Sequence, residues 1–283
     1  MITRQKKARR IVSEVSFYIV AILIAFICLL PVIWIFFTSI KIPKEIYAFP
    51  LIYIPRQPTL KNYLEVFLGS VNFGRYLLNS LIVSSFATLL SIGLSSIASY
   101  SLARLRYRGR KAILLCTLGL FMFPPMAIIP TLFLFFRLIG FTNTYYGLIL
   151  AHSAFFSPIA IWILTNYFKT IPMDLEDAAR IDGCTSLQIL KNIIFPLSLP
   201  GLVSAGLIVF IFSWNEFLAS LVLLSKNHLR TAVVGISLYP GEYAFPWELI
   251  STAIVLAIIP LILFTLFFQK YIVSGLTSGA LKY

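Results

Sequence analysis

Long apolar runs separated by short charged loops dominate the pattern of the chain. Five runs contain no charged residue and a sixth contains one, and each provides the roughly 20 residues that cross a bilayer core about 30 Å thick. The runs are residues 17–38, 76–103, 112–136, 147–168, 197–224 and 249–268. The pattern predicts an all-α integral membrane protein with six transmembrane helices.

Composition agrees with this class. Hydrophobic residues make up 59% of the 283 positions and the mean hydropathy is +0.93, so too little polar surface exists to cover a soluble globular domain. The net charge of +13 is interpreted as a topology signal rather than as a nucleic-acid surface. The first run is longer than the apolar core of a signal peptide and no small-residue cleavage site follows it, so we expect a retained helix.

Lysine and arginine positions predict the orientation. The arm 1–16 and the loop 104–111 each carry five basic residues within a short stretch, which places them in the cytoplasm. Both termini and the polar loop 169–200 then face inward, while residues 39–75 and 225–248 face outward. We divide the chain into a basic arm at 1–16, a six-helix transmembrane domain at 17–268 and a cytoplasmic tail at 269–283.

The polar loop predicts a helix-turn-helix. The first short helix opens at Pro172, whose missing N–H suits an early helical position, and closes at Gly183. The second opens with a capping box, since Gln188 stands three residues after Thr185. The first helix carries a narrow apolar stripe of small and aliphatic residues, which are Leu175, Ala178 and Ala179. Such a stripe on a membrane face suits close contact with a partner protein.

Within the apolar runs a few residues stand out. Phe123, Pro124 and Pro125 indicate a helix broken beside a cavity. Three serines, Ser91, Ser95 and Ser99, recur every four residues beside Gly93 and favour close helix packing.

Two polar residues in these runs remain open to different interpretations. Glu216 is the one charge within its run, so it faces protein or the pathway unless it lies near the outer end and is solvated. His152 has no acidic neighbour in the sequence and is interpreted as packed or pore-facing.

The sequence lacks the motifs of several common nucleotide-binding and catalytic sites. The sequence contains no GxxxxGK[ST], HExxH, CxxC or GxSxG, so it predicts neither an ATP site of the P-loop kind nor a catalytic constellation. A chain of this kind is not expected to be an enzyme by itself.

Residues 177–196 resemble the cytoplasmic EAA loop of binding-protein-dependent ABC importer permeases. The matching positions are Asp177-Ala178-Ala179, then Gly183, then Ile193 to Pro196, with Asp177 in place of the usual Glu and Phe195 in place of the usual Leu. The ARIDG run at 179–183, the WNEF run at 214–217 and the ending GLTSGALK are similar to the carbohydrate branch of the family. Together they resemble the maltose-transporter G-type permease subunits over nearly the whole chain.

The resemblance implies a type I importer permease in a prokaryotic inner membrane, with both termini cytoplasmic. Its expected partners are a second permease subunit, two cytoplasmic ATPase subunits and an external sugar-binding protein, with no nucleic acid. No cofactor is expected in this chain, because ATP and Mg²⁺ would be bound by the ATPase subunits. The loop 169–196 would be the coupling element, and its residues carried over from the family are Asp177, Ala178, Ala179, Asp182, Gly183, Ile193 and Pro196.

A sugar pathway needs aromatic faces together with amide or hydroxyl partners. Trp214 and Asn215 are the best-placed pair, and the further candidates are Asn79, Ser153, Phe155, Phe156 and Glu216, each of which could instead only pack between helices. The expected cargo is a di- or oligosaccharide of the maltose or trehalose kind. A permease for another solute such as glycerol phosphate, a secondary transporter or channel, and a membrane enzyme or assembly subunit are the alternatives.

Overall fold

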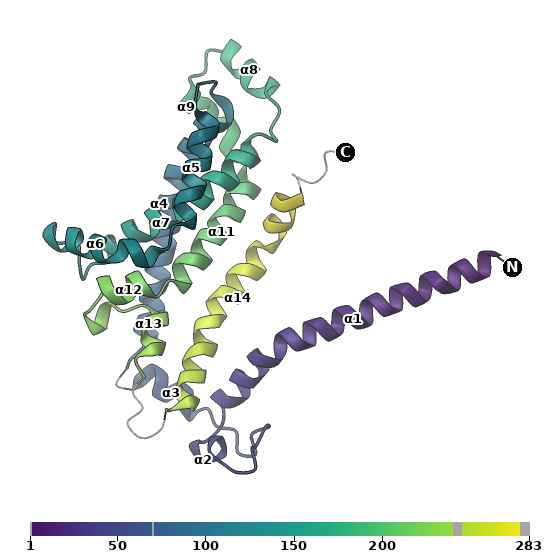
Figure 1. Cartoon of the computed structure of the whole chain (residues 1–283), viewed down its shortest axis with the longest axis vertical. Coiled ribbons are helices and arrows are strands. Elements are labelled where there is room, and N and C mark those ends of the chain that lie inside the picture. The colour runs from purple at the N-terminus through teal and green to yellow at the C-terminus, as the bar shows by residue number, and fades with distance from the viewer. Residues whose placement is uncertain (1, 70, 240–244, 278–283) are drawn as a thin grey trace. The chain divides into compact units, whose positions relative to one another are not determined.

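The computed structural model describes the backbone of residues 2–69, 71–239 and 245–277 and the side chains of residues 14–69, 71–239 and 245–271. Every regular element assigned in the described residues is a helix (Figure 1). The chain forms two compact units, residues 1–72 with 239–256 and residues 73–238 with 257–283. Most of the expected arm and tail therefore lies outside the described side chains.

The first unit contains α1 (Ile2–Ser39), α2 (Pro43–Ile46), α3 (Lys61–Leu68) and the start of α14 (Trp247–Thr277). Hydrogen bonds to backbone carbonyls at the end of α1 join these helices. The Asn62 side-chain amide donates to the carbonyls of Ser39 and Lys41 at 2.8 and 2.9 Å, and the Thr252 hydroxyl donates to that of Ser39 at 3.1 Å. The amide of α3 and the hydroxyl of α14 therefore hold the end of α1 in place.

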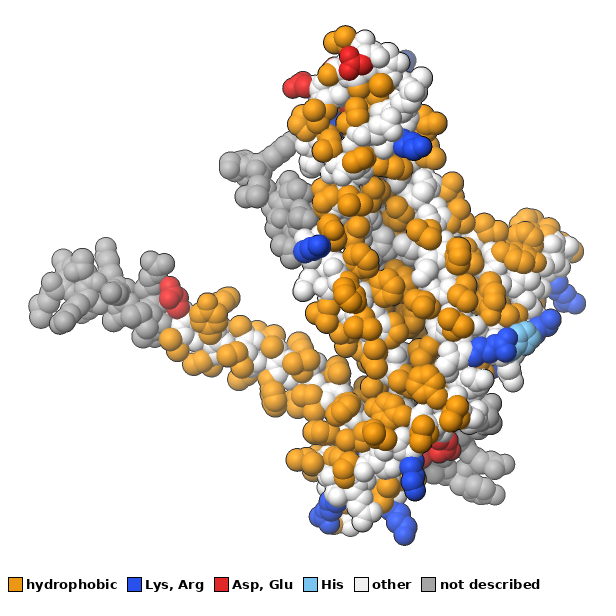
Figure 2. Space-filling view, turned by 180° about the vertical axis from the view of Figure 1, so that it is seen from behind, with side chains coloured by type: hydrophobic (Ala, Val, Ile, Leu, Met, Phe, Trp, Pro, Cys, Tyr) orange, Lys and Arg blue, Asp and Glu red, His pale blue; other side chains and the backbone are white. Residues whose placement is uncertain are grey.

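The second unit is a helical bundle. Its longer helices are α4 (Phe73–Arg104), α5 (Arg110–Met122), α6 (Pro125–Leu138), α7 (Tyr145–Phe168), α8 (Asp174–Ile181) and α11 (Leu199–Asn215), together with the remainder of α14. Its shorter elements are α9 (Ser186–Ile189), the π-helix η1 (Leu190–Ile194), α10 (Phe195–Leu197), α12 (Leu218–Leu223), the 3₁₀ turn η2 (Asn227–Leu229) and α13 (Ala232–Ser237). Hydrophobic side chains cover most of the face seen in Figure 2.

Four helices are long and apolar enough to cross a membrane: Glu14–Ser39, Phe73–Arg104, Tyr145–Phe168 and Trp247–Tyr271. Two further candidates are bent pairs, Arg110–Met122 with Pro125–Leu138 at 89° and Ser186–Leu197 with Leu199–Asn215 at 81°. The described residues therefore contain six spans if each bent pair counts as one. Prediction of one continuous helix over 197–224 is wrong, because α11 ends at Asn215 and a separate short helix follows.

The predicted break at Phe123 is confirmed. Phe123 is extended, with ψ at 129°, as expected for a residue that precedes proline, and Pro124 and Pro125 begin α6 without backbone N–H donors. A cavity of about 600 Å³ lies beside the break, and Phe123, Phe155 and Phe156 line it. The third run is therefore interrupted rather than continuous.

The predicted serine face is confirmed as a helix contact. Ser95 Oγ donates to the Ser157 carbonyl at 3.2 Å, and Ser99 Oγ donates to that of Ile161 at 3.0 Å. These bonds join α4 to α7, which lie side by side with α11 in Figure 1. Gly93 is exposed and does not belong to this face. Small hydroxyl side chains here let two helices approach and satisfy each other's carbonyls.

Candidate functional site

The helix-turn-helix at 169–200 caps one end of the bundle (Figure 1). Its first helix, α8, begins at Asp174 and not at Pro172, which lies two residues ahead. Asp174, Glu176 and Asp177 stand in the first turn, where negative charge complements the positive end of the helix dipole. The amphipathic eight-residue helix thus starts with its acidic residues.

Gly183 ends α8 as predicted. Its φ of +82° lies in the left-handed region, its N–H donates to the Arg180 carbonyl at 3.0 Å, and the N–H of Cys184 donates to that of Ala179 at 2.9 Å. This pair of bonds is a Schellman motif, which satisfies the last carbonyls of a helix and favours glycine at the left-handed position. The chain reverses here because of a local backbone requirement.

The second helix begins with the predicted capping box. The Thr185 side chain accepts the Gln188 N–H, and the Gln188 side chain accepts that of Thr185 at 2.7 Å. The helix continues through the π-helical turn η1 into α10. Ile193 packs against the buried cluster formed by Ile189, Leu190 and Ile194, while Pro196 is exposed.

A buried ion pair attaches α8 to the end of α4. Arg104 Nε lies 2.6 Å from Glu176 Oε1, and the two side chains are 3% and 0% exposed. The Tyr100 hydroxyl donates to Glu176 Oε2 at 3.1 Å, and Arg104 also donates to the Ile171 carbonyl at 2.8 Å. We call Tyr100, Arg104 and Glu176 the clasp. It fixes both the position and the rotation of α8.

The clasp divides α8 into two faces. Glu176 and Ala179, three residues apart, point into the bundle, and Ala179 packs in the chain's own core. The prediction that Ala179 lies against an ATPase partner is therefore wrong. The exposed residues are Asp174, Leu175, Asp177, Ala178, Arg180, Ile181 and Asp182, and Asp177 pairs with Arg180 at 2.8 Å. Acidic side chains of this end are visible in Figure 2.

The proposed sugar-pathway residues do not form one site. Trp214 is 2% exposed and stacks on Phe210 at 5.7 Å, whereas Asn215 points outward and donates to the Ile211 carbonyl at 2.8 Å. Trp214 therefore packs between helices, and the two residues predicted as the best-placed pair face different surroundings. Asn215 remains a candidate.

Two other pathway candidates hold the bundle together. Asn79 is buried, donates to the carbonyls of His228 and Arg230 at 3.0 and 2.8 Å, and accepts the Tyr145 hydroxyl at 2.8 Å. Ser153 is buried and donates to the carbonyl of Ala87 in α4 at 3.2 Å and to that of Ile149 in its own helix at 2.6 Å. The polar atoms of both residues are therefore bonded within the chain. Phe155 and Phe156 do line the cavity beside the broken third run.

Glu216 lies at the break between α11 and α12. Its carboxylate accepts the N–H groups of Ala219 and Ser220 at 2.7 and 2.9 Å, which caps the start of α12. Its side chain is 11% exposed, and Oε2 lies 3.1 Å from Nε2 of His152. Nδ1 of the same histidine lies 2.7 Å from Ser213 Oγ. His152 therefore contacts both sides of the break.

Sequence reasoning missed three of these residues. In the sequence, Arg104 stands out only as one of the five basic residues of 104–111 and Glu176 does not stand out, although Tyr100 and Arg104 are four residues apart and so share a helix face. That spacing, with a carboxylate in the next polar loop, was the available signal. His152 has no acidic neighbour in the sequence, but the fold places its Nε2 3.1 Å from Oε2 of Glu216, which lies 64 residues away along the chain.

Comparisons with known proteins agree on one class. Residues 91–278 match the family described as binding-protein-dependent transport system inner membrane component. The chain is 40% identical to a trehalose/maltose transport system permease protein of Thermococcus litoralis, over 96% of this chain and 98% of the relative. It is 41% identical to a sulfoquinovosyl glycerol transport system permease protein of Agrobacterium fabrum, over 90% of this chain and 89% of the relative.

A solved structure supports the same class. It belongs to a bacterial ABC transporter involved in the import of the acidic polysaccharide alginate. The TM-score is 0.77 at 25% sequence identity, with 93% of this chain and 96% of that chain covered.

Proposed function

The chain belongs to the family of binding-protein-dependent transport system inner membrane components, and we propose that it forms one half of the membrane pathway of an ATP-driven carbohydrate importer. The observation that carries this function is the helix-turn-helix at the end of the bundle. Its outer face is acidic and apolar, and its inner face is fixed to α4 by the clasp. A surface element so rigidly attached can transmit a push from a partner into the bundle.

The partner in this proposal is a cytoplasmic ATPase subunit that contacts the exposed face of α8. Leu175 and Ala178 would supply apolar contact, and Asp177 and Asp182 the charge. Closure of two ATPase subunits would move α8 and α4 together, as a rigid-body switch between inward-open and outward-open states. ATP and Mg²⁺ would be held by those subunits, and a second permease subunit would complete the pathway.

The proposed cargo is a di- or oligosaccharide of the trehalose or maltose kind, delivered by an external binding protein. Its support is the transport activities named for the similar permeases. Within the chain, Asn215 and the cavity lined by Phe155 and Phe156 are the proposed contacts for sugar. Aromatic rings suit the apolar face of a sugar and an amide suits its hydroxyls.

The proposed topology places both termini and the helix-turn-helix in the cytoplasm. The clasp supports it, because Arg104 begins the basic stretch 104–111 and contacts α8 directly. Both therefore lie on one side of the membrane, and short basic loops remain inside. A cysteine introduced at Asp182 should react with an impermeant thiol reagent only from the inside, and one introduced at Lys44 only from the outside. Labelling of both cysteines from the same side would contradict this orientation.

Reconstitution tests the function. The chain, its sister permease, the ATPase subunits and the binding protein are placed in proteoliposomes, and uptake of labelled trehalose and maltose is measured with ATP inside. We expect uptake that requires both ATP and the binding protein. Uptake that persists without the ATPase subunits would establish a secondary transporter instead, and uptake of glycerol phosphate without uptake of sugar would reassign the cargo.

A further inference from the structure

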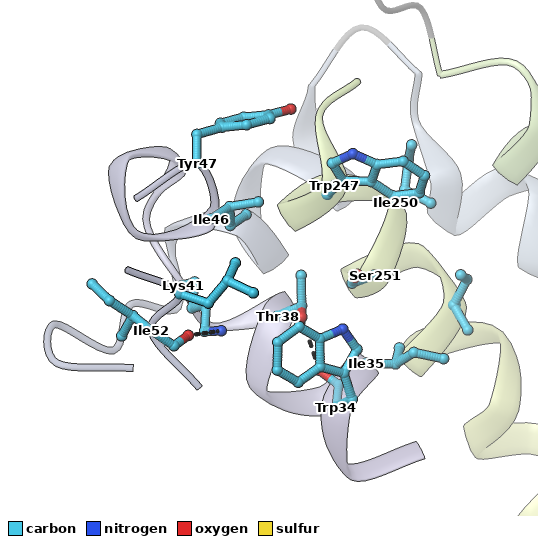
Figure 3. A pocket seen from close by; sticks show the side chains of 12 residues that line it. Trp34, Ile35, Thr38, Lys41, Ile46, Tyr47, Ile52, Trp247, Ile250 and Ser251 are labelled. Carbon is cyan, nitrogen blue, oxygen red and sulfur yellow. Dashed lines mark hydrogen bonds between the residues drawn. The ribbon is translucent and has the colours of Figure 1, made fainter. Parts of the chain in front are cut away.

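A pocket of about 540 Å³ lies in the first unit, where two spans end (Figure 3). The span of α1 ends at Ser39 and that of α14 begins at Trp247. Trp34 and Thr38 come from the last turns of the first span, and Trp247 and Ser251 from the first turns of the last. The pocket therefore lies at the level where the chain leaves the hydrocarbon core.

Three aromatic rings surround the pocket. Trp34, Tyr47 and Trp247 are 44%, 54% and 47% exposed, and Figure 3 shows them around one space. Tryptophan and tyrosine concentrate at membrane interfaces, where one end of the ring is apolar and the other wet. Aliphatic side chains also line the pocket, among them Ile35 of α1 and Ile250 and Ile254 of α14. An alkyl chain fits such walls, whereas the hydroxyls of a sugar would find few partners there.

Lys41 supplies a buried positive charge beside the aromatic rings. The residue is 2% exposed, and its ammonium donates to the Ile52 carbonyl at 2.5 Å and lies 4.6 Å from the centre of the Trp34 ring. An ammonium has three N–H donors, and within the described part of the chain Ile52 provides its one hydrogen-bond acceptor. Burial lowers the pKa of Lys41 more than the nearby Glu45 carboxylate raises it. An anion in the pocket would stabilise the charged form.

Two further polar residues bear on the site. The Glu45 carboxylate accepts the backbone N–H groups of Arg56 and Gln57, at 3.1 and 2.9 Å. Ser251 is 6% exposed and lines the pocket. Its hydroxyl can donate to an acceptor oxygen of a ligand bound there.

We propose that this pocket binds a phospholipid, with the headgroup phosphate at Lys41 and Ser251 and one acyl chain along the aliphatic walls. Under the proposed topology the lipid belongs to the outer leaflet. Anionic phosphatidylglycerol should bind more strongly than zwitterionic phosphatidylcholine, because the site contributes a cation. The lipid would fill the space between the ends of α1 and α14 and stabilise their arrangement.

Lipid retention tests the proposal without a transport assay, so its failure is separable from failure of the proposed function. The complex is purified in mild detergent, and bound phospholipid is counted by native mass spectrometry. Lys41→Met should reduce retained phosphatidylglycerol about tenfold, the effect of losing one charged hydrogen bond. Lys44→Met is the matched control, since Lys44 is exposed, three residues away and outside the pocket, and should retain lipid normally.

A second measurement covers the case in which Lys41→Met does not fold. Brominated phosphatidylglycerol should quench the fluorescence of Trp34 and Trp247, and Ser251→Ala should weaken that quenching in a folded complex. Equal retention and equal quenching in all variants would overturn the proposal. Displacement of the brominated lipid by soluble glycerol phosphate would also overturn the proposal, because the pocket would then bind a water-soluble solute rather than a lipid.

Discussion

Replacing Arg104 with Met tests the clasp most directly. The change removes the cation that lies 2.6 Å from Glu176 and leaves a carboxylate that is 0% exposed. Breaking a buried ion pair by removing one partner costs about 3 to 5 kcal/mol. Tyr100 still donates to this carboxylate, and Arg180 lies 3.6 Å from it, so we take the lower end, about 3 kcal/mol.

That free energy acts on the docking of α8 rather than on the membrane helices. Each 1.4 kcal/mol is a factor of ten in an equilibrium, so the ratio of docked to undocked α8 should fall about a hundredfold. Insertion depends on the apolar spans, which are unchanged. We therefore expect a complex that assembles in the membrane but loses the stimulation of ATP hydrolysis by loaded binding protein.

The assay is ATPase activity of the reconstituted complex, with and without loaded binding protein, together with hydrogen exchange of the α8 amides. Arg104→Met should lower the stimulated rate and speed exchange throughout α8. Arg180→Met is the matched control: Arg180 is 41% exposed, its closer pair is with the exposed Asp177, and exposed pairs contribute at most about 1 kcal/mol. The double variant Arg104→Met/Glu176→Met should recover part of the stimulation, because an apolar pair can replace a buried ion pair with little loss.

Full stimulation and unchanged exchange in Arg104→Met would refute the argument, since α8 would then be docked without the clasp. A double variant worse than the sum of the two single variants would refute it as well, because the two residues would not be partners.

Five further substitutions test other parts of the site. Ala179→Trp should overpack the core by about 1 to 3 kcal/mol and lower thermal stability, whereas Ala178→Trp, on the exposed face, should fold normally and fail to retain the ATPase in a pull-down. Gly183→Val should cost about 1 to 2 kcal/mol and reduce stimulated hydrolysis, because its φ is +82°. Glu216→Gln should lower uptake more than expression, because the amide oxygen can replace only part of the cap on α12. Asn215→Leu should lower uptake while ATPase assembly is retained, because its exposed amide is removed.

Each of these has a result that would count against it. Identical behaviour of the two alanine variants would contradict the assignment of faces on α8. Gly183→Asn is the control for the turn, since asparagine tolerates the left-handed region, and it should be milder than Val. Full uptake by Glu216→Gln across pH would support the alternative in which Glu216 is merely solvated. Unchanged uptake by Asn215→Leu would exclude Asn215 from the sugar pathway.

The sequence alone was sufficient wherever the cause is local. Lipid contact requires about 20 apolar residues in succession, so hydropathy predicted the positions of the candidate spans other than the run at 197–224. The break at Pro124 follows from the missing backbone N–H groups, and the turn at Gly183 from the left-handed region. The capping box at Thr185 needs only residues three apart. None of these features depends on what packs against them.

Tertiary structure decided everything that depends on the rotation of a helix against its neighbour. Adjacent carboxylates differ completely, since Glu176 is buried in the clasp and Asp177 is exposed. The same holds for Ala179 and Ala178. A step of one residue turns a side chain by about 100°, and the local pattern on an eight-residue helix does not say which side meets the bundle. The contact of His152 with Glu216 joins residues 64 apart, and only the packing of α7 against α11 brings them within hydrogen-bond distance.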